Sequence, residues 1–296
     1  MALTAPRIYI MQPGYWGCVW WQLRKAAIAL HEDGCFGIAK GVAYSALLSF
    51  FPVLTSLATV LVQAQLVDIS PIISQLLTEA LPPGTEQLVL SHFVAQGQRP
   101  TSLLVAAVIL SVFAASGAML SLMEGFQAVY RIPTGRPFLK QRGMAIVLVF
   151  SLAVPLLGAS SLILFGQRFE RNLLFWLRLI PETASFTGWL AVVGVAARYL
   201  VAFGAFVLVS IAMYYFGPNR KQSIAKVWPG AIVSTTLWLV ATVIFAWYVR
   251  NIANYNVLYG SVGAVIALLV WQYVLAVVAL MGCEYNAVRE RAQSTT

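Results

Sequence analysis

The sequence predicts an all-α membrane protein with six transmembrane helices, amphipathic helices at the membrane surface, and both the N- and C-termini in the cytoplasm. Hydrophobic residues make up 60% of the 296 residues and charged residues only 10%, whereas soluble domains carry about 25% charged residues. The mean hydropathy is +0.81. Uncharged runs of about 20 residues recur along the chain, and a helix of about that length crosses the hydrocarbon core of a bilayer.

The N-terminal third of the chain contains one predicted span between two amphipathic segments. Residues 1–37 are expected to form a cytoplasmic segment with a helix that lies in the membrane interface or packs beneath the bundle. The first span covers about 41–67 and contains Pro52, which kinks a helix unless a hydroxyl such as that of Ser49 covers the freed carbonyl. Residues 68–100 are predicted to be an amphipathic helical hairpin at the outer surface.

The other five spans complete a membrane domain of residues 38–286, which a cytoplasmic tail of residues 287–296 follows. They cover about 101–123, 143–165, 197–216, 229–249 and 260–283, with a second amphipathic outer segment at 166–186. The fourth span has two alternative starts because Arg198 lies within its apolar pattern. A start near 188 buries Arg198 in the membrane at a cost of several kcal/mol. A start near 197 is favoured because it leaves Arg198 at the interface, where it needs no buried partner.

Lysine and arginine residues predict the orientation, because cytoplasmic loops carry an excess of them. The segments assigned to the cytoplasm contain Arg7, Arg24, Lys25, Lys40, Arg131, Arg136, Lys140, Arg142, Arg220, Lys221, Lys226, Arg289 and Arg291. The segments assigned to the outside contain Arg99, Arg168, Arg171, Arg178 and Arg250. The net charge of +9 is therefore attributed to loops that contact anionic membrane lipids, and we expect no nucleic-acid partner.

Five short motifs occur in order along the predicted spans. They are Ala43-Tyr44-Ser45 with Ser49-Phe50-Phe51-Pro52, Tyr215 with Gly217-Pro218-Asn219, Trp228-Pro229-Gly230-Ala231, Tyr259-Gly260-Ser261-Val262-Gly263 and Gly282-Cys283-Glu284-Tyr285-Asn286. On these motifs the chain, from about Trp21 to Val288, resembles the YihY/BrkB family of inner-membrane proteins, once mislabelled as ribonuclease BN. The resemblance implies a bacterial inner-membrane protein linked to envelope functions, with lipid transport as one expected role. One position departs from the family pattern, since Glu124 or Gln127 stands where an asparagine is expected at the end of the second span.

No set of residues that would carry catalysis is visible in the sequence. The two histidines, His31 and His92, are predicted on opposite sides of the membrane, and metal-ligand and phosphate-loop motifs are absent. The acidic residues are dispersed, with Asp33 among those before the first span. The three cysteines are too few and too scattered for a disulfide framework or a zinc site. We therefore expect no enzymatic activity, no metal and no cofactor, and the ribonuclease label is disfavoured.

The expected function is the handling of lipids or other amphiphiles by a transporter or flippase-like protein in envelope maintenance. The alternative is a membrane scaffold that transports nothing. A polar cavity open to the bilayer would favour transport, and a tightly packed bundle would favour a scaffold. Candidate substrate-binding residues are Lys40, Tyr44, Ser49, Glu124, Arg198, Glu284 and Asn286. Structural roles are expected for Pro52, Pro218, Asn219, Pro229, Gly230, Tyr259, Gly260, Gly263 and Gly282.

Three of the candidate residues share a similar predicted depth in the membrane. Lys40 lies at the inner start of the first span, and Glu124 and Glu284 lie at the inner ends of the second and sixth spans. Charged side chains at span ends are commonly solvated at the interface, which is one interpretation. The other is a charged cluster between the first, second and sixth helices that lines the cytoplasmic end of a groove.

Overall fold

The computed structural model describes residues 15–63, 101–133, 135–176, 189–251 and 261–294, and this part of the chain is helical without strands. Its helices are α1 (Tyr15–Glu32), α2 (Cys35–Gln63), α5 (Thr101–Val129), α6 (Phe138–Trp176), α7 (Trp189–Phe216), α8 (Ile224–Asn251) and α10 (Ser261–Ser294). All of them except α1 are long and apolar enough to cross a membrane. The prediction of an all-α protein with six spans is therefore confirmed.

Two predicted features fall on parts of the chain that the structure does not describe. The outer hairpin at 68–100 lies outside the described residues, and so do Tyr259 and Gly260 of the fourth motif. Gly263 of the same motif is buried in the first turn of α10. The structural roles expected for Tyr259 and Gly260 therefore stay predictions.

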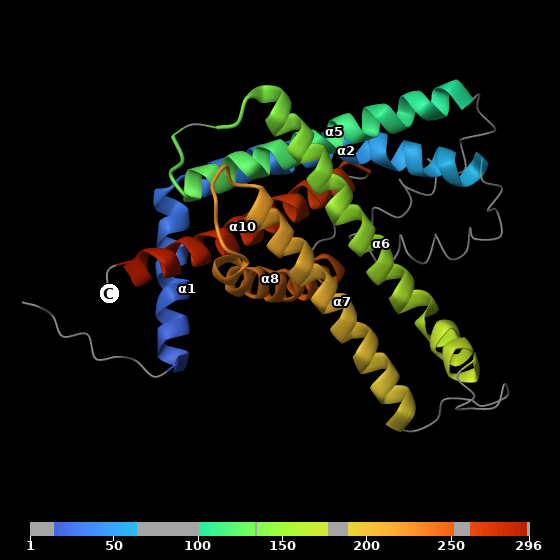
Figure 1. Cartoon of the computed structure of the whole chain (residues 1–296). Coiled ribbons are helices and arrows are strands. Elements are labelled where there is room, and N and C mark those ends of the chain that lie inside the picture. The colour runs from blue at the N-terminus through green and yellow to red at the C-terminus, as the bar shows by residue number, and fades with distance from the viewer. Residues whose placement is uncertain (1–14, 64–100, 134, 177–188, 252–260, 295–296) are drawn as a thin grey trace, which may run out of the picture.

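Among the spanning helices, α10 packs chiefly against α2, α5 and α8. Figure 1 shows α2 and α5 side by side, with α10 crossing the bundle close to both, and α6 and α7 extending away together. α8 packs against α10 and α7. The fully buried side chains at the centre come from all six spanning helices and include Cys35, Met123, Phe126, Leu148, Tyr214, Val227 and Leu280. The rings of Phe126 and Tyr214 meet edge to face at 5.4 Å, a favourable aromatic geometry that joins α5 to α7.

Several helices extend beyond the predicted spans. α6 is a single helix through Trp176, so it includes part of the segment predicted as a separate amphipathic outer element at 166–186. α10 continues through the predicted tail to Ser294. α7 begins at Trp189, so the favoured start near 197 is wrong. The stretch before Arg198 contains no proline or charge that would stop a helix, and Arg198 is only 9% exposed, with its Nε donating to the Gly194 carbonyl at 3.2 Å.

Pro52 lies inside α2, and the helix continues through it. Proline removes the hydrogen bond to the carbonyl four residues earlier, that of Leu48. Ser49 does not cover this carbonyl as predicted, because its hydroxyl donates to the Ala46 carbonyl at 2.8 Å. Ser111 of α5 places its hydroxyl 2.7 Å from the carbonyl oxygen of Pro52 itself and 2.6 Å from that of Ala107 in its own helix, so its single proton serves one of the two at a time. This contact between helices ties α5 to α2 at the proline.

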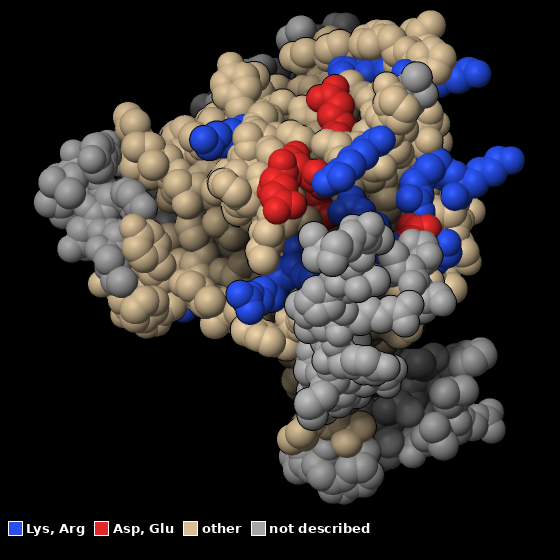
Figure 2. All heavy atoms as spheres, turned by 90° about the vertical axis from the view of Figure 1, so that its left-hand side faces the viewer, with Lys and Arg blue, Asp and Glu red and all other residues tan. Residues whose placement is uncertain are grey.

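One end of the bundle gathers the starts of α2 and α8 and the ends of α5 and α10, and we call it the basal end. Asp33, just before α2, pairs with Arg131, just after α5. Lys226 near the start of α8 pairs with Glu290 near the end of α10. Figure 2 looks at this end and shows Lys and Arg side chains gathered on it, with acidic side chains between them. Such an excess of cations matches the predicted cytoplasmic side, although the side itself stays a prediction.

The N-terminal helix α1 packs across the basal end, as Figure 1 shows. Its buried Ala26 and Ala29 contact Tyr285 and Val288 of α10. This is one of the two predicted placements, a helix packed against the bundle. Trp20 on its other face is 72% exposed, which is compatible with the interfacial placement as well.

Candidate functional site

A cavity of about 490 Å³ lies at the centre of the six spanning helices, all of which line it. Alanine and large aliphatic residues form most of its wall, and the polar residues in the wall are Ser49, Tyr214, Ser210, Ser234, Thr235 and Gln272. Most of these polar groups already have partners. Ser49 and Ser234 donate to carbonyls of their own helices, and Ser210 and Thr235 lie 3.4 Å apart. The described lining contains no charged residue.

Of the predicted substrate-binding residues, only Ser49 lines this cavity. Lys40, Tyr44 and Glu124 are exposed, while Arg198 is buried elsewhere along α7. Glu284 and Asn286 are buried near the basal end. The predicted cluster of Lys40, Glu124 and Glu284 is therefore not formed, because the first two face outward whereas Glu284 is 0% exposed. Burial at this depth also excludes the interpretation of Glu284 as a solvated interfacial acid.

Asn286 joins α10 to α8 through its side-chain amide. Its Oδ1 accepts a hydrogen bond from the Gly230 backbone N–H at 2.7 Å, and its Nδ2 donates to the Val227 carbonyl at 2.9 Å. Asn286 is 2% exposed. The two helices come close enough for this because Gly230 and Gly282 face each other at the crossing. A Cβ at Gly230 would collide with the Gly282 carbonyl oxygen and with the Asn286 amide.

The crossing explains why the third and fifth sequence motifs contain small residues and an asparagine. Small residues let two backbones approach, and polar side chains then bond across the interface. Tyr214 of α7 adds a third helix, since its hydroxyl donates to the Ala279 carbonyl at 2.8 Å. These contacts agree with the structural roles predicted for Gly230 and Gly282. Asn286 was predicted to bind substrate, but its side chain bonds to the backbone of α8.

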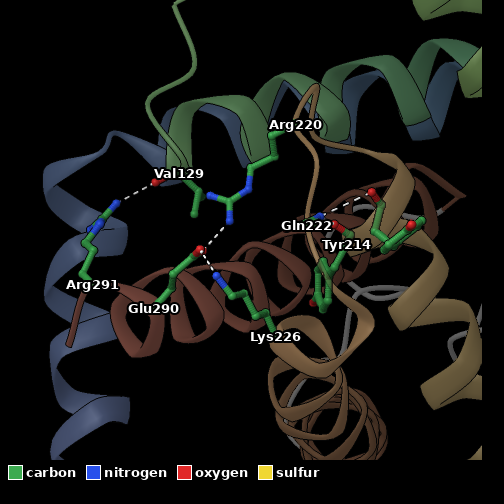
Figure 3. Close-up of polar contacts among 8 residues, drawn as sticks. Val129, Tyr214, Arg220, Gln222, Lys226, Glu290 and Arg291 are labelled. Atoms are coloured by element: carbon green, nitrogen blue, oxygen red, sulfur yellow. Dashed lines mark hydrogen bonds and ion pairs between the residues drawn. The ribbon is translucent and has the colours of Figure 1, made fainter. Parts of the chain in front are cut away.

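Glu290 holds the end of α10 to the segment that joins α7 to α8, as Figure 3 shows. Its carboxylate accepts from Arg220 and, at 2.9 Å, from Lys226. The Arg220 guanidinium also lies 4.1 Å above the Tyr130 ring, a cation–π geometry. Burial raises the pKa of Tyr130 above its usual range, so the phenol stays neutral. Glu290 lies in the predicted tail of residues 287–296, and the charge pattern of the sequence did not indicate that it bonds to Arg220 and Lys226.

Replacing Glu290 by glutamine is expected to lower the free energy of unfolding by about 1–2 kcal/mol, because two charge-assisted hydrogen bonds are weakened and two cations lose their counter-charge. The measurement is thermal melting of the purified protein in detergent. Glu124→Gln is the matched control, since Glu124 is exposed and should melt as the wild type does. Equal melting temperatures of the two variants would contradict a stabilising role for Glu290.

The same end of the bundle contains a cap on α7. Arg136 donates to the carbonyls of Phe216, Gly217 and Pro218 at 2.9, 3.1 and 3.0 Å. A cation at a helix C-terminus satisfies carbonyls that have no partner within the helix. Burial lowers the pKa of Arg136 from its ordinary value. The predicted structural role of Pro218 therefore includes accepting this hydrogen bond; Asn219 lies in the same turn.

A second polar cluster at the basal end was not predicted. Arg131 has a left-handed backbone with φ of 51°, and its N–H and that of Ile132 bond to the Ala128 and Gln127 carbonyls at 2.9 Å each. This is the Schellman arrangement that usually needs glycine. It directs the Arg131 guanidinium onto Asp33, whose neighbour Gly34 also has a positive φ, of 67°. Gly34 was the residue from which this turn could have been predicted, because glycine readily adopts a positive φ.

The comparisons with known proteins place this arrangement in a family. Residues 27–296 match the family described as virulence factor BrkB. The chain is 28% identical over 250 residues to the ribonuclease-like protein YfkH of Bacillus subtilis (strain 168), covering 83% of this chain and 86% of that protein. It is 26% identical over 285 residues to a UPF0761 membrane protein of Alkalilimnicola ehrlichii, covering 89% of this chain and 58% of that protein. A UPF0761 membrane protein of Aeromonas salmonicida is 26% identical over 241 residues, 81% of this chain and 74% of its own.

No solved structure matches the chain. The family match extends over nearly the whole length, and two of the three relatives named are described as membrane proteins of bacteria. The resemblance that the five motifs predicted is confirmed by this match. The chain is an integral membrane protein that belongs to the virulence factor BrkB family.

Proposed function

We propose that this protein binds a lipid or another amphiphile in its central cavity and moves it within the bacterial inner membrane. The observation that carries the proposal is the cavity of about 490 Å³ between the six spanning helices. Small-molecule sites typically have volumes of about 300–1,000 Å³. A space of this size within a membrane bundle leaves room for a ligand, and a scaffold would have no need of it.

The chemistry of the wall indicates which part of an amphiphile fits. Alanine and aliphatic side chains offer an apolar surface, and the described lining offers no charge to a headgroup. Gln272 is the exception among the polar lining groups, because its side chain has no hydrogen-bond partner in the described part of the chain. We infer that hydrocarbon occupies the cavity, that Gln272 bonds to a neutral polar group such as an ester, and that an anionic headgroup stays near the cations of the basal end.

Two other functions receive less support. A scaffold was expected to be tightly packed, and a cavity of about 490 Å³ favours ligand binding over such packing. We expected a polar cavity that would bind the headgroup of an amphiphile. The observed cavity is mostly apolar, so we propose that it binds the hydrocarbon chain. We propose no enzymatic activity, since the described lining contains no histidine, carboxylate or cysteine to act as an acid, base or nucleophile. The ribonuclease-like name of one relative is not extended to this chain.

The test is lipid movement in liposomes that contain the purified protein. A fluorescent phospholipid is placed in both leaflets, and a membrane-impermeant reductant bleaches those that reach the outer one. We expect bleaching beyond the outer-leaflet share with the wild type. Ala153→Phe should reduce this excess, because Ala153 lines the cavity and the larger ring would occupy it.

The matched control is Leu157→Phe, one turn further along α6. Leu157 is 65% exposed on the outside of the bundle, so this variant should keep the wild-type excess. Mass spectrometry of the purified proteins should show a retained lipid with the wild type that is reduced with Ala153→Phe. Bleaching equal to that of empty liposomes, together with no retained lipid, would overturn the proposal and favour the scaffold.

A further inference from the structure

Glu284 is an acidic side chain buried inside the protein without a cation bonded to it. It is 0% exposed. Its Oε1 lies 4.0 Å from the Cys35 thiol, a weak donor, and its Oε2 has no hydrogen-bond partner. An ionised carboxylate accepts hydrogen bonds and donates none, and an isolated buried charge is very costly. The environment therefore disfavours a charge on Glu284.

Asp33 lies near Glu284, and one of its two carboxylate oxygens also lacks a hydrogen-bond partner. Its side chain is 10% exposed, and its Oδ1 accepts from Arg131 Nε at 3.2 Å and Nη2 at 3.0 Å. Its Oδ2 has no hydrogen-bond partner and is 3.8 Å from the nearest Arg291 nitrogen. Cys35, two residues after Asp33, has its thiol 4.0 Å from Glu284, and Arg291, on the same helix as Glu284, lies 3.8 Å from Asp33, so the two carboxyl groups lie in the same small region. Two adjacent carboxylates cannot both ionise easily.

We propose that Glu284 and Asp33 form a proton-binding site that holds one proton between their two carboxyl groups. A proton on Glu284 Oε2 converts that oxygen into a donor, and the Asp33 Oδ2 can accept from it. One proton thus satisfies both oxygens that have no partner. We place the proton on Glu284 because Arg131 donates two hydrogen bonds to Asp33, whereas Glu284 receives none from a cation in the described residues.

The groups that face this site come from each element packed around it. Asp33 lies in the turn between α1 and α2, Cys35 begins α2, and Arg131 follows α5. Arg291 and the neighbouring Cys283 belong to α10. The left-handed backbone of Arg131 precedes a guanidinium that bonds to Asp33. A monovalent metal ion fits less well, because these two carboxyl groups offer it only two oxygens without partners, Asp33 Oδ2 and Glu284 Oε2.

The site would couple proton binding to the packing of the basal end. Loss of the proton leaves two adjacent carboxylates on opposite sides of the contact between the α1–α2 turn and α10. Their repulsion would loosen this contact. The folded protein would then hold the proton more tightly than the unfolded chain does, so stability should be present at low pH and lost as the pH rises. This behaviour does not depend on the central cavity or on lipid transport.

The experiment compares the melting temperature of the full chain in detergent across about pH 5 to pH 9. We expect the wild type to lose several degrees as the pH rises. Glu284→Gln should remove most of this loss, because the amide stays neutral and can still donate to Asp33. Glu124→Gln, which alters an exposed acid, should keep the wild-type slope. Exchanging sodium for potassium at constant ionic strength should leave all three curves unchanged.

Infrared spectroscopy provides a second measurement that needs no variant. The wild type at neutral pH should show the C=O stretch of a protonated carboxylic acid, and the band should disappear at high pH. Absence of this band in the folded wild type would overturn the proposal, even if Glu284→Gln failed to fold. A pH slope that Glu284→Gln leaves unchanged, or a melting temperature that depends on sodium, would overturn it as well.

Discussion

Gly282→Ala is expected to lower the free energy of unfolding by about 3 kcal/mol or more, an overpacking cost at the upper end of the usual range. An added Cβ would lie 2.7 Å from the Gly230 carbonyl oxygen and 2.6 Å from the Ser234 Cβ, and it would also collide with the Tyr214 hydroxyl. The carbonyl belongs to a helix backbone and cannot rotate away as a side chain can. Accommodating the methyl group requires α8 and α10 to separate.

Separation of these helices would have further consequences. The Asn286 bonds to α8 and the Tyr214 bond to the Ala279 carbonyl depend on the same close approach. Thermal melting in detergent and the yield of folded protein measure the effect.

The control for this prediction is Gly204→Ala in α7. A Cβ at Gly204 would meet nothing within 4 Å, so the substitution should gain about 1 kcal/mol from helix propensity. The two variants make the same chemical change in spanning helices, and they should shift the melting temperature in opposite directions. If both shift it equally, the close crossing at Gly282 is not what holds α8 to α10.

Asn286→Ala is expected to cost about 2–6 kcal/mol, because it leaves two buried backbone groups without a partner at about 1–3 kcal/mol each. These are the Gly230 N–H and the Val227 carbonyl, which the Asn286 amide satisfies at 2.7 and 2.9 Å. Water has little access to repair the loss, since Asn286 is 2% exposed. The protein should therefore melt well below the wild type in detergent.

Asn251→Ala is a matched control for the asparagine. Asn251 ends α8, the helix to which Asn286 bonds, and donates to the Trp247 carbonyl at 2.8 Å, but it is exposed, so water replaces the lost bond. Its cost should be under about 0.5 kcal/mol. Asn286→Asp should not rescue stability, because the carboxylate can accept from Gly230 but cannot donate to Val227. If Asn286→Ala is as stable as Asn251→Ala, the Asn286 amide does not stabilise the contact between α8 and α10.

The six spans could be predicted from the sequence because a transmembrane helix depends on a local property. An apolar run of sufficient length must satisfy its backbone hydrogen bonds internally once it lies in lipid, whichever helix it later contacts. The family motifs could be recognised on the same linear basis. The helix ends were less predictable, as α7 and α10 show, because apolar or helix-compatible residues continue past the length that a bilayer needs.

The site could not be predicted in the same way, because it depends on contacts between residues far apart in the chain. The motif around Gly230 and the motif around Gly282 and Asn286 were both visible, but nothing local indicated that one bonds to the other. Glu284 resembled Glu124 in sequence, as an acid at the end of a span. Helix packing buried Glu284 beside Asp33 and left Glu124 exposed, since the direction of a side chain on an apolar helix follows from which neighbours surround it.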